Sequence, residues 1–200
     1  MSPLPLPFTW PLGALFWMLW LWAFWPEFRV LREARRAQQG ADPTARDPSF
    51  RPLIAGQRLV MTLALVVAFL APRLAIRHHR EVVFAVGLAV LLAASLLRRH
   101  CFRMLGADFR GAVTVRDGQP VVDRGAYRYL RHPSYAGALL LHLGFGLALG
   151  NWGSLAILLL GIPPLFVYRI RVEERTLLER LGASYADYVA RTSRLIPGVW

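Results

Sequence analysis

Apolar residues occur along this chain in five blocks that polar segments separate. The blocks cover residues 8–25, 53–71, 82–97, 136–149 and 152–168. Their apolar residues surround the whole helix instead of forming one stripe, and blocks of this kind are typical of membrane-spanning helices. The pattern therefore predicts an all-α integral membrane protein with about five transmembrane helices and a helical C-terminal region.

Breaker residues divide these blocks. Pro26 is predicted to close the first block and Pro72 the second, since proline lacks the backbone N–H that a helix uses. Residues 28–39 predict a helix along the membrane surface. Only Gly150 and Asn151 separate the last two blocks, which predicts a tight helical hairpin.

The polar segments contain further predicted elements. Residues 113–122 predict a small hairpin around an Asp-Gly turn. The tail predicts one helix over 171–181 and another over 183–191. The Pro163-Pro164 pair is expected to kink the fifth span.

Composition supports the membrane assignment. Apolar residues make up 56% of the chain, above the roughly 45–50% of ordinary globular proteins. The net charge is +12, and all 24 basic residues are arginine, mostly in segments between apolar blocks. This distribution follows the positive-inside rule, and no nucleic-acid motif accompanies it, so we expect no nucleic-acid partner.

The charge distribution also predicts topology. The segments 27–52 and 98–131 and the tail are Arg-rich, which predicts an outside N-terminus and a cytoplasmic C-terminus. The connector 73–80 would then lie outside, against the rule. The first block is predicted to remain as a span, not a cleaved signal. Cys101 is alone, and no metal site is predicted.

Two polar clusters are candidates for chemistry. Arg169, Glu173 and Glu174 follow the fifth block, where charged groups beside hydrocarbon are costly unless they are paired or functional. Two interpretations remain open, a functional site or an Arg169–Glu173 i,i+4 pair worth a few tenths of a kcal/mol.

The second cluster, residues 127–135, contains three tyrosines, two arginines and a histidine. Its rings and exposed amides would suit an adenine-like ligand, although an aromatic and basic belt before a span is also compatible. His142 is expected to pack against or bond a neighbouring helix.

These residues resemble a known family. Residues 125–137, from Gly125 to Gly137, are similar to the G-x-Y-x-x-x-R-H-P-x-Y-x-G signature of the isoprenylcysteine carboxyl methyltransferase family. The Arg169-x-x-x-Glu173-Glu174 motif and the Arg194-Leu-Ile-Pro ending also resemble it. The resemblance extends over residues 105–197.

The resemblance implies an N-terminal membrane region over 1–104 and a cofactor-binding region over 105–200. It implies S-adenosylmethionine as cofactor, which would reach the site from the cytoplasm, whereas a lipophilic acceptor would reach it from the bilayer. The implied catalytic residues are Arg169, facing the acceptor, and Glu174, holding the amino-acid end of the cofactor. The implied cofactor residues are Tyr127, Arg128, Tyr129, Leu130, His132, Tyr135, Glu173 and Glu174.

The residue types are compatible with methyl transfer, whose main requirement is alignment of acceptor and methyl group. Arg169 could orient an acceptor carboxylate. An ideal helix places Glu173 on the face of Arg169, whereas the resemblance favours Glu174.

We therefore expect transfer of a methyl group to a lipophilic acceptor, such as an isoprenylcysteine carboxylate, a lipidated substrate or a lipid. Alternatives are an NADPH-dependent sterol-type reductase and a non-catalytic membrane protein of the same fold. The arginine-only base usage suggests a prokaryotic cytoplasmic membrane.

Overall fold

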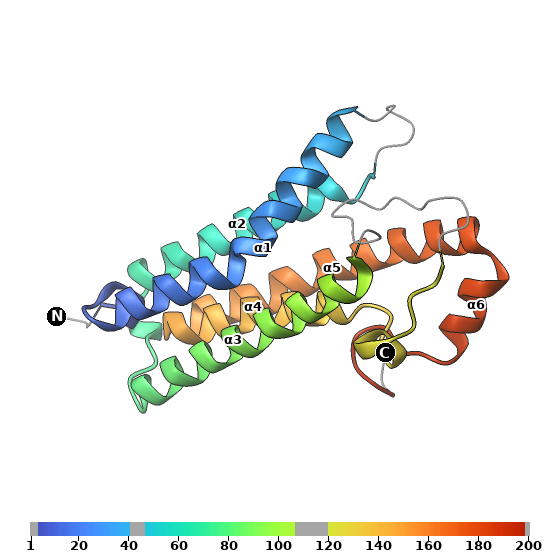
Figure 1. Ribbon diagram of the computed structural model, residues 1–200. Helices are drawn as coiled ribbons and strands as arrows, with labels where there is room; N and C mark the ends of the chain where they lie inside the picture. Colours follow the sequence, from blue (N-terminus) through green and yellow to red (C-terminus); the bar gives the residue numbers. More distant parts are fainter. Residues whose placement is uncertain (1–3, 41–46, 107–119, 199–200) are drawn as a thin grey trace.

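The computed structural model describes residues 4–40, 47–106 and 120–198. Five long helices lie side by side, and a short sixth helix follows them (Figure 1). In chain order these are α1 (Leu12–Gly40), α2 (Phe50–Leu70), α3 (Arg80–Leu105), α4 (Pro133–Leu149), α5 (Trp152–Leu181) and α6 (Ala183–Ala190), with 3-10 turns η1 (Leu6–Phe8), η3 (Pro72–Leu74) and η5 (Gly125–Arg128). The predicted all-α class is confirmed.

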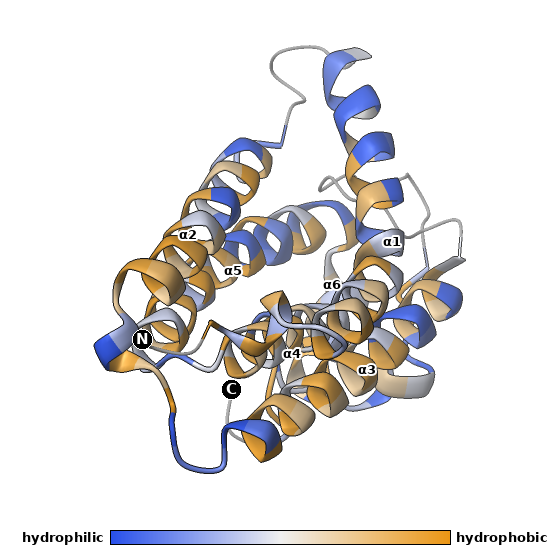
Figure 2. Cartoon of the chain, turned by 90° about the vertical axis from the view of Figure 1, so that its left-hand side faces the viewer, coloured by the Kyte–Doolittle hydropathy of each residue, from blue (hydrophilic) through white to orange (hydrophobic). Residues whose placement is uncertain are grey.

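Among the described residues, three helices, α2, α3 and α5, are long and apolar enough to cross a membrane. The fourth block forms α4, which is apolar but has only 17 residues. Large apolar side chains point away from the bundle, among them Leu70 at 78% and Leu160 at 76% exposure. Figure 2 shows this apolar character along the bundle, with polar residues gathered toward helix ends. The multi-pass membrane fold is thus confirmed, and spanning by α1 and α4 stays a prediction.

Small residues allow the helices to approach closely. A Cβ at Gly144 of α4 would lie 2.8 Å from the carbonyl oxygen of Gly87 in α3. A Cβ at Gly161 of α5 would lie 2.8 Å from the Val60 side chain of α2. Because lipid provides little hydrophobic drive between helices, such close backbone packing is a main source of their association.

The predicted hairpin between α4 and α5 is confirmed. Gly150 adopts a left-handed conformation (φ 64°), and the Asn151 side-chain oxygen accepts from the Ser154 N–H at 3.1 Å. The Asn151 amide also donates to the Ala71 carbonyl at 3.0 Å, and Ile76 N–H donates to Gly150 at 2.8 Å. The turn and the α2–α3 connector therefore meet at the same end of the bundle.

Three predicted boundaries are wrong. Pro26 does not close the first helix, because α1 continues to Gly40 and Glu27 forms an ion pair with buried Arg98 of α3. The third helix continues past residue 97 to Leu105. Residues 171–181 are not a separate helix, since α5 continues through both prolines to Leu181. Most of the predicted 113–122 hairpin lies outside the described residues.

Candidate active site

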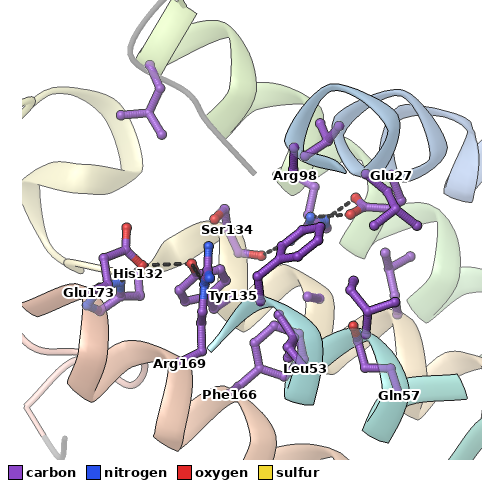
Figure 3. A pocket seen from close by; sticks show the side chains of 18 of the residues that line it. Glu27, Leu53, Gln57, Arg98, His132, Ser134, Tyr135, Phe166, Arg169 and Glu173 are labelled. Atoms are coloured by element: carbon purple, nitrogen blue, oxygen red, sulfur yellow. Dashed lines mark hydrogen bonds and ion pairs between the residues drawn. The ribbon is translucent and has the colours of Figure 1, made fainter. Parts of the chain in front are cut away.

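A cavity of about 930 Å³ opens among α1, α2, α4, α5 and α6. Its walls come from both halves of the chain. The polar wall contains Arg131, His132, Tyr135, Arg169, Glu173 and Tyr185. Apolar side chains continue the cavity between α1, α2 and α5, among them Trp20, Phe24, Leu65 and Phe166. Figure 3 shows labelled residues of this lining.

The His132-Pro133 pair sets the start of α4. Pro133 occupies the first turn, where a missing N–H is tolerated. His132 is 4% exposed, and its ring stacks on Tyr135 with centroids 5.4 Å apart and planes 8° apart. This parallel pair places two aromatic rings at the polar wall.

The C-terminal tail holds this segment in place through backbone hydrogen bonds. Arg131 N–H donates to the Ser193 carbonyl at 2.7 Å, and His132 N–H donates to the Arg194 carbonyl at 3.0 Å. The Tyr188 hydroxyl donates to the Tyr127 carbonyl at 2.7 Å. The two motifs that carry the resemblance, though about sixty positions apart, are thus one structural unit.

Glu174 lies at the centre of an ion-pair network. Its carboxylate accepts from Nε of Arg131 at 2.8 Å and from Nε of Arg194 at 2.8 Å. Nε2 of His132 lies 3.2 Å from the same carboxylate. With three partners and 13% side-chain exposure, Glu174 connects α5 to the α4 start and the tail, and it is not part of the cavity lining.

Glu173 lines the cavity instead. The Tyr135 hydroxyl donates to Glu173 Oε2 at 2.7 Å and accepts from Arg169 Nε at 3.1 Å (Figure 3). Arg169 and Glu173 therefore share a helix face, as the spacing predicts, and the Tyr135 hydroxyl connects them. This chain of donors holds a carboxylate and a guanidinium at a fixed distance on the cavity wall.

Two acidic residues of the N-terminal half are the ion-pair partners of buried arginines, and the sequence analysis missed both. Asp47 pairs with Arg169, and Glu27 pairs with Arg98. Arg98 also donates to the Ser134 carbonyl, which anchors the first turn of α4. A signal was present for Arg98, since an arginine directly after an apolar block requires a partner.

Tyr185 was also missed as a site residue. Its side chain is 3% exposed and lines the cavity, and its hydroxyl has no hydrogen-bond partner among the described residues. Burial, with the nearby Glu174 and Glu173 charges, raises the pKa of Tyr185, so the hydroxyl keeps its proton. A buried, unpartnered donor that faces a cavity indicates a place for a ligand acceptor atom.

The structure brings together part of the predicted set. Tyr127, His132, Tyr135, Arg169 and Glu173 line the cavity. Arg128 and Tyr129 point to solvent, Tyr129 at 64% exposure, and half-buried Leu130 and Glu174 lie behind the wall.

His142 is buried deeper in the cavity. Its Nδ1 lies 2.7 Å from the Ala138 carbonyl of its own helix, and its ring contacts Phe24 and Phe166. It therefore packs between helices, and its hydrogen bond stays within α4.

The protein has a helical membrane fold. Its cavity combines a polar wall, whose residues suit a cofactor, with an apolar extension, and these features define its class. Residues 85–179 match the model of the "Isoprenylcysteine carboxyl methyltransferase (ICMT) family". The resemblance that the motifs indicated is therefore confirmed over residues 85–179.

Curated relatives carry the same name. A protein-S-isoprenylcysteine O-methyltransferase of Schizosaccharomyces pombe is 32% identical over 56% of this chain and 48% of its own length. The Saccharomyces cerevisiae protein of that name is 30% identical over 66% and 58%, respectively. Protein-S-isoprenylcysteine O-methyltransferase B of Arabidopsis thaliana is 29% identical over 56% and 58%. The chain thus matches about half the length of these relatives. They are eukaryotic, so they give the expected prokaryotic origin no support.

A solved structure supports the fold. The eukaryotic intramembrane Ras methyltransferase ICMT aligns with a TM-score of 0.60 and 24% identity, over 73% of this chain and 52% of that chain.

Proposed function

We propose that this protein is a membrane methyltransferase that uses S-adenosylmethionine and transfers its methyl group to a lipophilic acceptor. The family match and the relatives' names support this activity. The observation that carries it is a cavity in which a charged and aromatic wall adjoins an apolar extension. A reaction between a polar cofactor and a lipid-soluble acceptor requires both environments to meet.

The residues of the polar wall fit this cofactor. Its cationic amino and sulfonium groups match the Glu173 carboxylate, and its carboxylate matches Arg131. The stacked His132 and Tyr135 rings suit the adenine face, and the Tyr185 hydroxyl supplies a donor for a hydroxyl or carboxylate oxygen. When bound, the cofactor supplies an electrophilic methyl group.

The chain's own residues would bind and orient the reactants. Arg169 and Glu173, connected by Tyr135, hold opposite charges at fixed positions on the wall. Glu174 acts indirectly, because its ion pair with Arg131 and its hydrogen bond with His132 keep both residues in position. The geometry therefore favours Glu173 for cofactor contact and gives Glu174 a positioning role.

The acceptor side would be the apolar extension between α1, α2 and α5. Trp20, Phe24, Leu65 and Phe166 provide aromatic and aliphatic walls that exclude water and suit an isoprenoid or acyl chain. We propose an isoprenylcysteine carboxylate, free or on a lipidated protein, or a lipid as acceptor. In this division, residues 1–104 supply most of the acceptor side, which Phe166 of α5 completes, and residues 105–200 hold the cofactor.

The N-terminus would lie outside and the C-terminus in the cytoplasm. The positions of the helix ends are compatible with this membrane orientation, because the α4–α5 turn and the α2–α3 connector lie at the same end of the bundle. The cavity's charged wall lies at the opposite ends of α4 and α5. A soluble cofactor would therefore reach it from the Arg-rich cytoplasmic side.

Calorimetry on detergent-purified protein tests the proposal, with S-adenosylmethionine as ligand and NADPH titrated alongside. Saturable S-adenosylmethionine binding with a stoichiometry near one supports it. Methyl transfer to an amine-blocked S-farnesylcysteine then tests the acceptor class. Binding of NADPH alone would refute the methyltransferase assignment in favour of a reductase.

A further inference from the structure

The segment before α2 contributes a buried acidic group to a site that lies mainly in the other half of the chain. The Asp47 side chain is fully buried, and it pairs with Arg169, 122 positions away. Neither residue of this segment, Asp47 or Ser49, lies in the region that matches the family model. The contact therefore connects the N-terminal region directly to the polar wall of the cavity.

Every acceptor in this cluster is satisfied. One Asp47 oxygen accepts from the Ser49 N–H at 2.9 Å and from the Ser49 hydroxyl at 2.6 Å. The other oxygen accepts from Nη1 of Arg169. The Ser49 oxygen also accepts from that Nη1 at 2.8 Å. Two residues that are separated only by Pro48 thus hold the same guanidinium nitrogen.

We propose that Asp47 and Ser49 are positioning residues for the active site. They fix the guanidinium of Arg169 and, through it, the hydrogen-bond direction from Arg169 to Tyr135 to Glu173. The inference rests on the proposed function, in which Arg169 and Glu173 face acceptor and cofactor.

The chemistry of the groups enforces that direction. A guanidinium is planar and only donates, so holding Nη1 also orients Nε. Nε of Arg169 donates to the Tyr135 oxygen at 3.1 Å, which leaves the tyrosine's single proton for Glu173 at 2.7 Å. Glu173 therefore accepts this hydrogen bond, and its carboxyl group is held in a fixed position on the cavity wall.

The same cluster connects the site to the acceptor side. The Asp47 N–H donates to Oε1 of Gln38, near the end of α1, at 3.1 Å. The helix α2 starts at Phe50, directly after Ser49, and Phe50 also lines the cavity. Helices that frame the apolar extension are thus connected to the residue that faces the acceptor.

The test uses the full-length protein and five variants: Asp47→Asn, Ser49→Ala, Arg169→Leu, the double variant Asp47→Asn/Arg169→Leu, and Asp123→Asn. Asp123 is the matched control, because its ion pair with Arg191 at 3.0 Å is exposed and neither residue is among those that line the cavity. Calorimetry gives the affinity and stoichiometry for S-adenosylmethionine, and methyl transfer to amine-blocked S-farnesylcysteine gives kcat per binding site.

We expect Asp47→Asn to keep the binding stoichiometry, to weaken cofactor affinity severalfold and to lower kcat on the order of 100-fold, the loss that a small misplacement causes. The acceptor KM should not rise, because Arg169 loses its neutralising partner and attracts a carboxylate more strongly. Ser49→Ala should change the same quantities in the same direction, but less. Asp123→Asn should match the wild type.

The double variant distinguishes a positioning role of Asp47 from a role in stability alone, because it measures whether the effects of Asp47 and Arg169 depend on each other. In the Arg169→Leu background, Asp47→Asn should cause no further loss of affinity or kcat. It should nevertheless raise the apparent unfolding midpoint, because it removes a buried carboxylate whose Arg169 partner has been replaced. Independent losses in the double variant, or wild-type affinity and kcat in Asp47→Asn, would overturn the proposal. If the wild type binds no S-adenosylmethionine, the proposed function fails, and the midpoints alone decide whether Asp47 and Arg169 are coupled.

Discussion

Replacing Tyr185 by phenylalanine should change stability and cofactor affinity in opposite directions. The hydroxyl is buried and has no partner among the described residues, so the ligand-free protein bears its desolvation cost. Leaving such a group unpaired costs roughly 1–3 kcal/mol. Tyr185→Phe should therefore leave the ligand-free protein unchanged or stabilise it by about 1 kcal/mol, a rise of roughly 2–4 °C in unfolding midpoint.

Cofactor binding should weaken in the same variant. If the Tyr185 hydroxyl donates to bound S-adenosylmethionine, its removal forfeits one hydrogen bond with a net value of about 0.5–1.5 kcal/mol. That energy corresponds to a roughly two- to twelvefold rise in Kd. Calorimetry measures the Kd, and thermal unfolding in detergent measures the midpoint without ligand.

Tyr188 is the matched control, because it lies on the same helix and is equally buried, at 3% exposure. Its hydroxyl donates to the Tyr127 carbonyl at 2.7 Å, so Tyr188→Phe should lower the midpoint. The reasoning is refuted if Tyr185→Phe destabilises the ligand-free protein as much as Tyr188→Phe does while the Kd stays unchanged.

Three further predictions concern the charges, the packing and the topology. Glu174→Gln should lower the free energy of unfolding by about 3 kcal/mol, because the buried Arg131 side chain loses its carboxylate partner. Glu173→Gln should mainly raise the Kd for S-adenosylmethionine. Gly144→Val should cost at least about 2 kcal/mol, since its side chain meets the backbone of α3, as thermal unfolding will show. In His78→Cys, an impermeant thiol reagent should label the cysteine in intact cells, because this position would lie outside. In Arg191→Cys, the reagent should label the cysteine only after lysis, because this position would lie in the cytoplasm.

Each of these has a contradicting result. Equal effects of the two glutamine variants on stability would refute the division between Glu173 and Glu174. Gly40→Ala is the control for packing, because no atom of the described residues outside its own stretch of helix lies within 4 Å of the added Cβ. A comparable loss of stability in this variant would contradict the argument. Labelling of position 191 in intact cells would reverse the topology.

The sequence alone determined the class of fold and most helix positions. Long apolar blocks have few stable alternatives to helices in a bilayer, since every backbone polar group must be satisfied within the chain. The Gly150-Asn151 turn was also predictable, because few residue pairs can reverse the chain so tightly between two helices. The resemblance of residues 125–137 and 169–174 then indicated the family before any geometry was known.

Helix boundaries near polar residues depended on distant contacts. Pro26 ends a helix in an isolated segment, but the Glu27–Arg98 ion pair joins α1 to α3 across 71 positions. The residues around Pro26 do not predict that pairing. The same applies to α5, whose charged extension is held by Arg131 and the tail.

Only the tertiary structure distinguished the two adjacent glutamates. They differ by one position, hence by about 100° around the helix, and the packing of α4 and the tail decides which of them faces the cavity. Asp47 and Tyr185 entered the site in the same way, one through an ion pair across 122 positions and one through an unpartnered hydroxyl. Residue types along the chain predict the chemistry available, whereas the folded backbone decides which groups meet, because side chains act over a few ångströms in space.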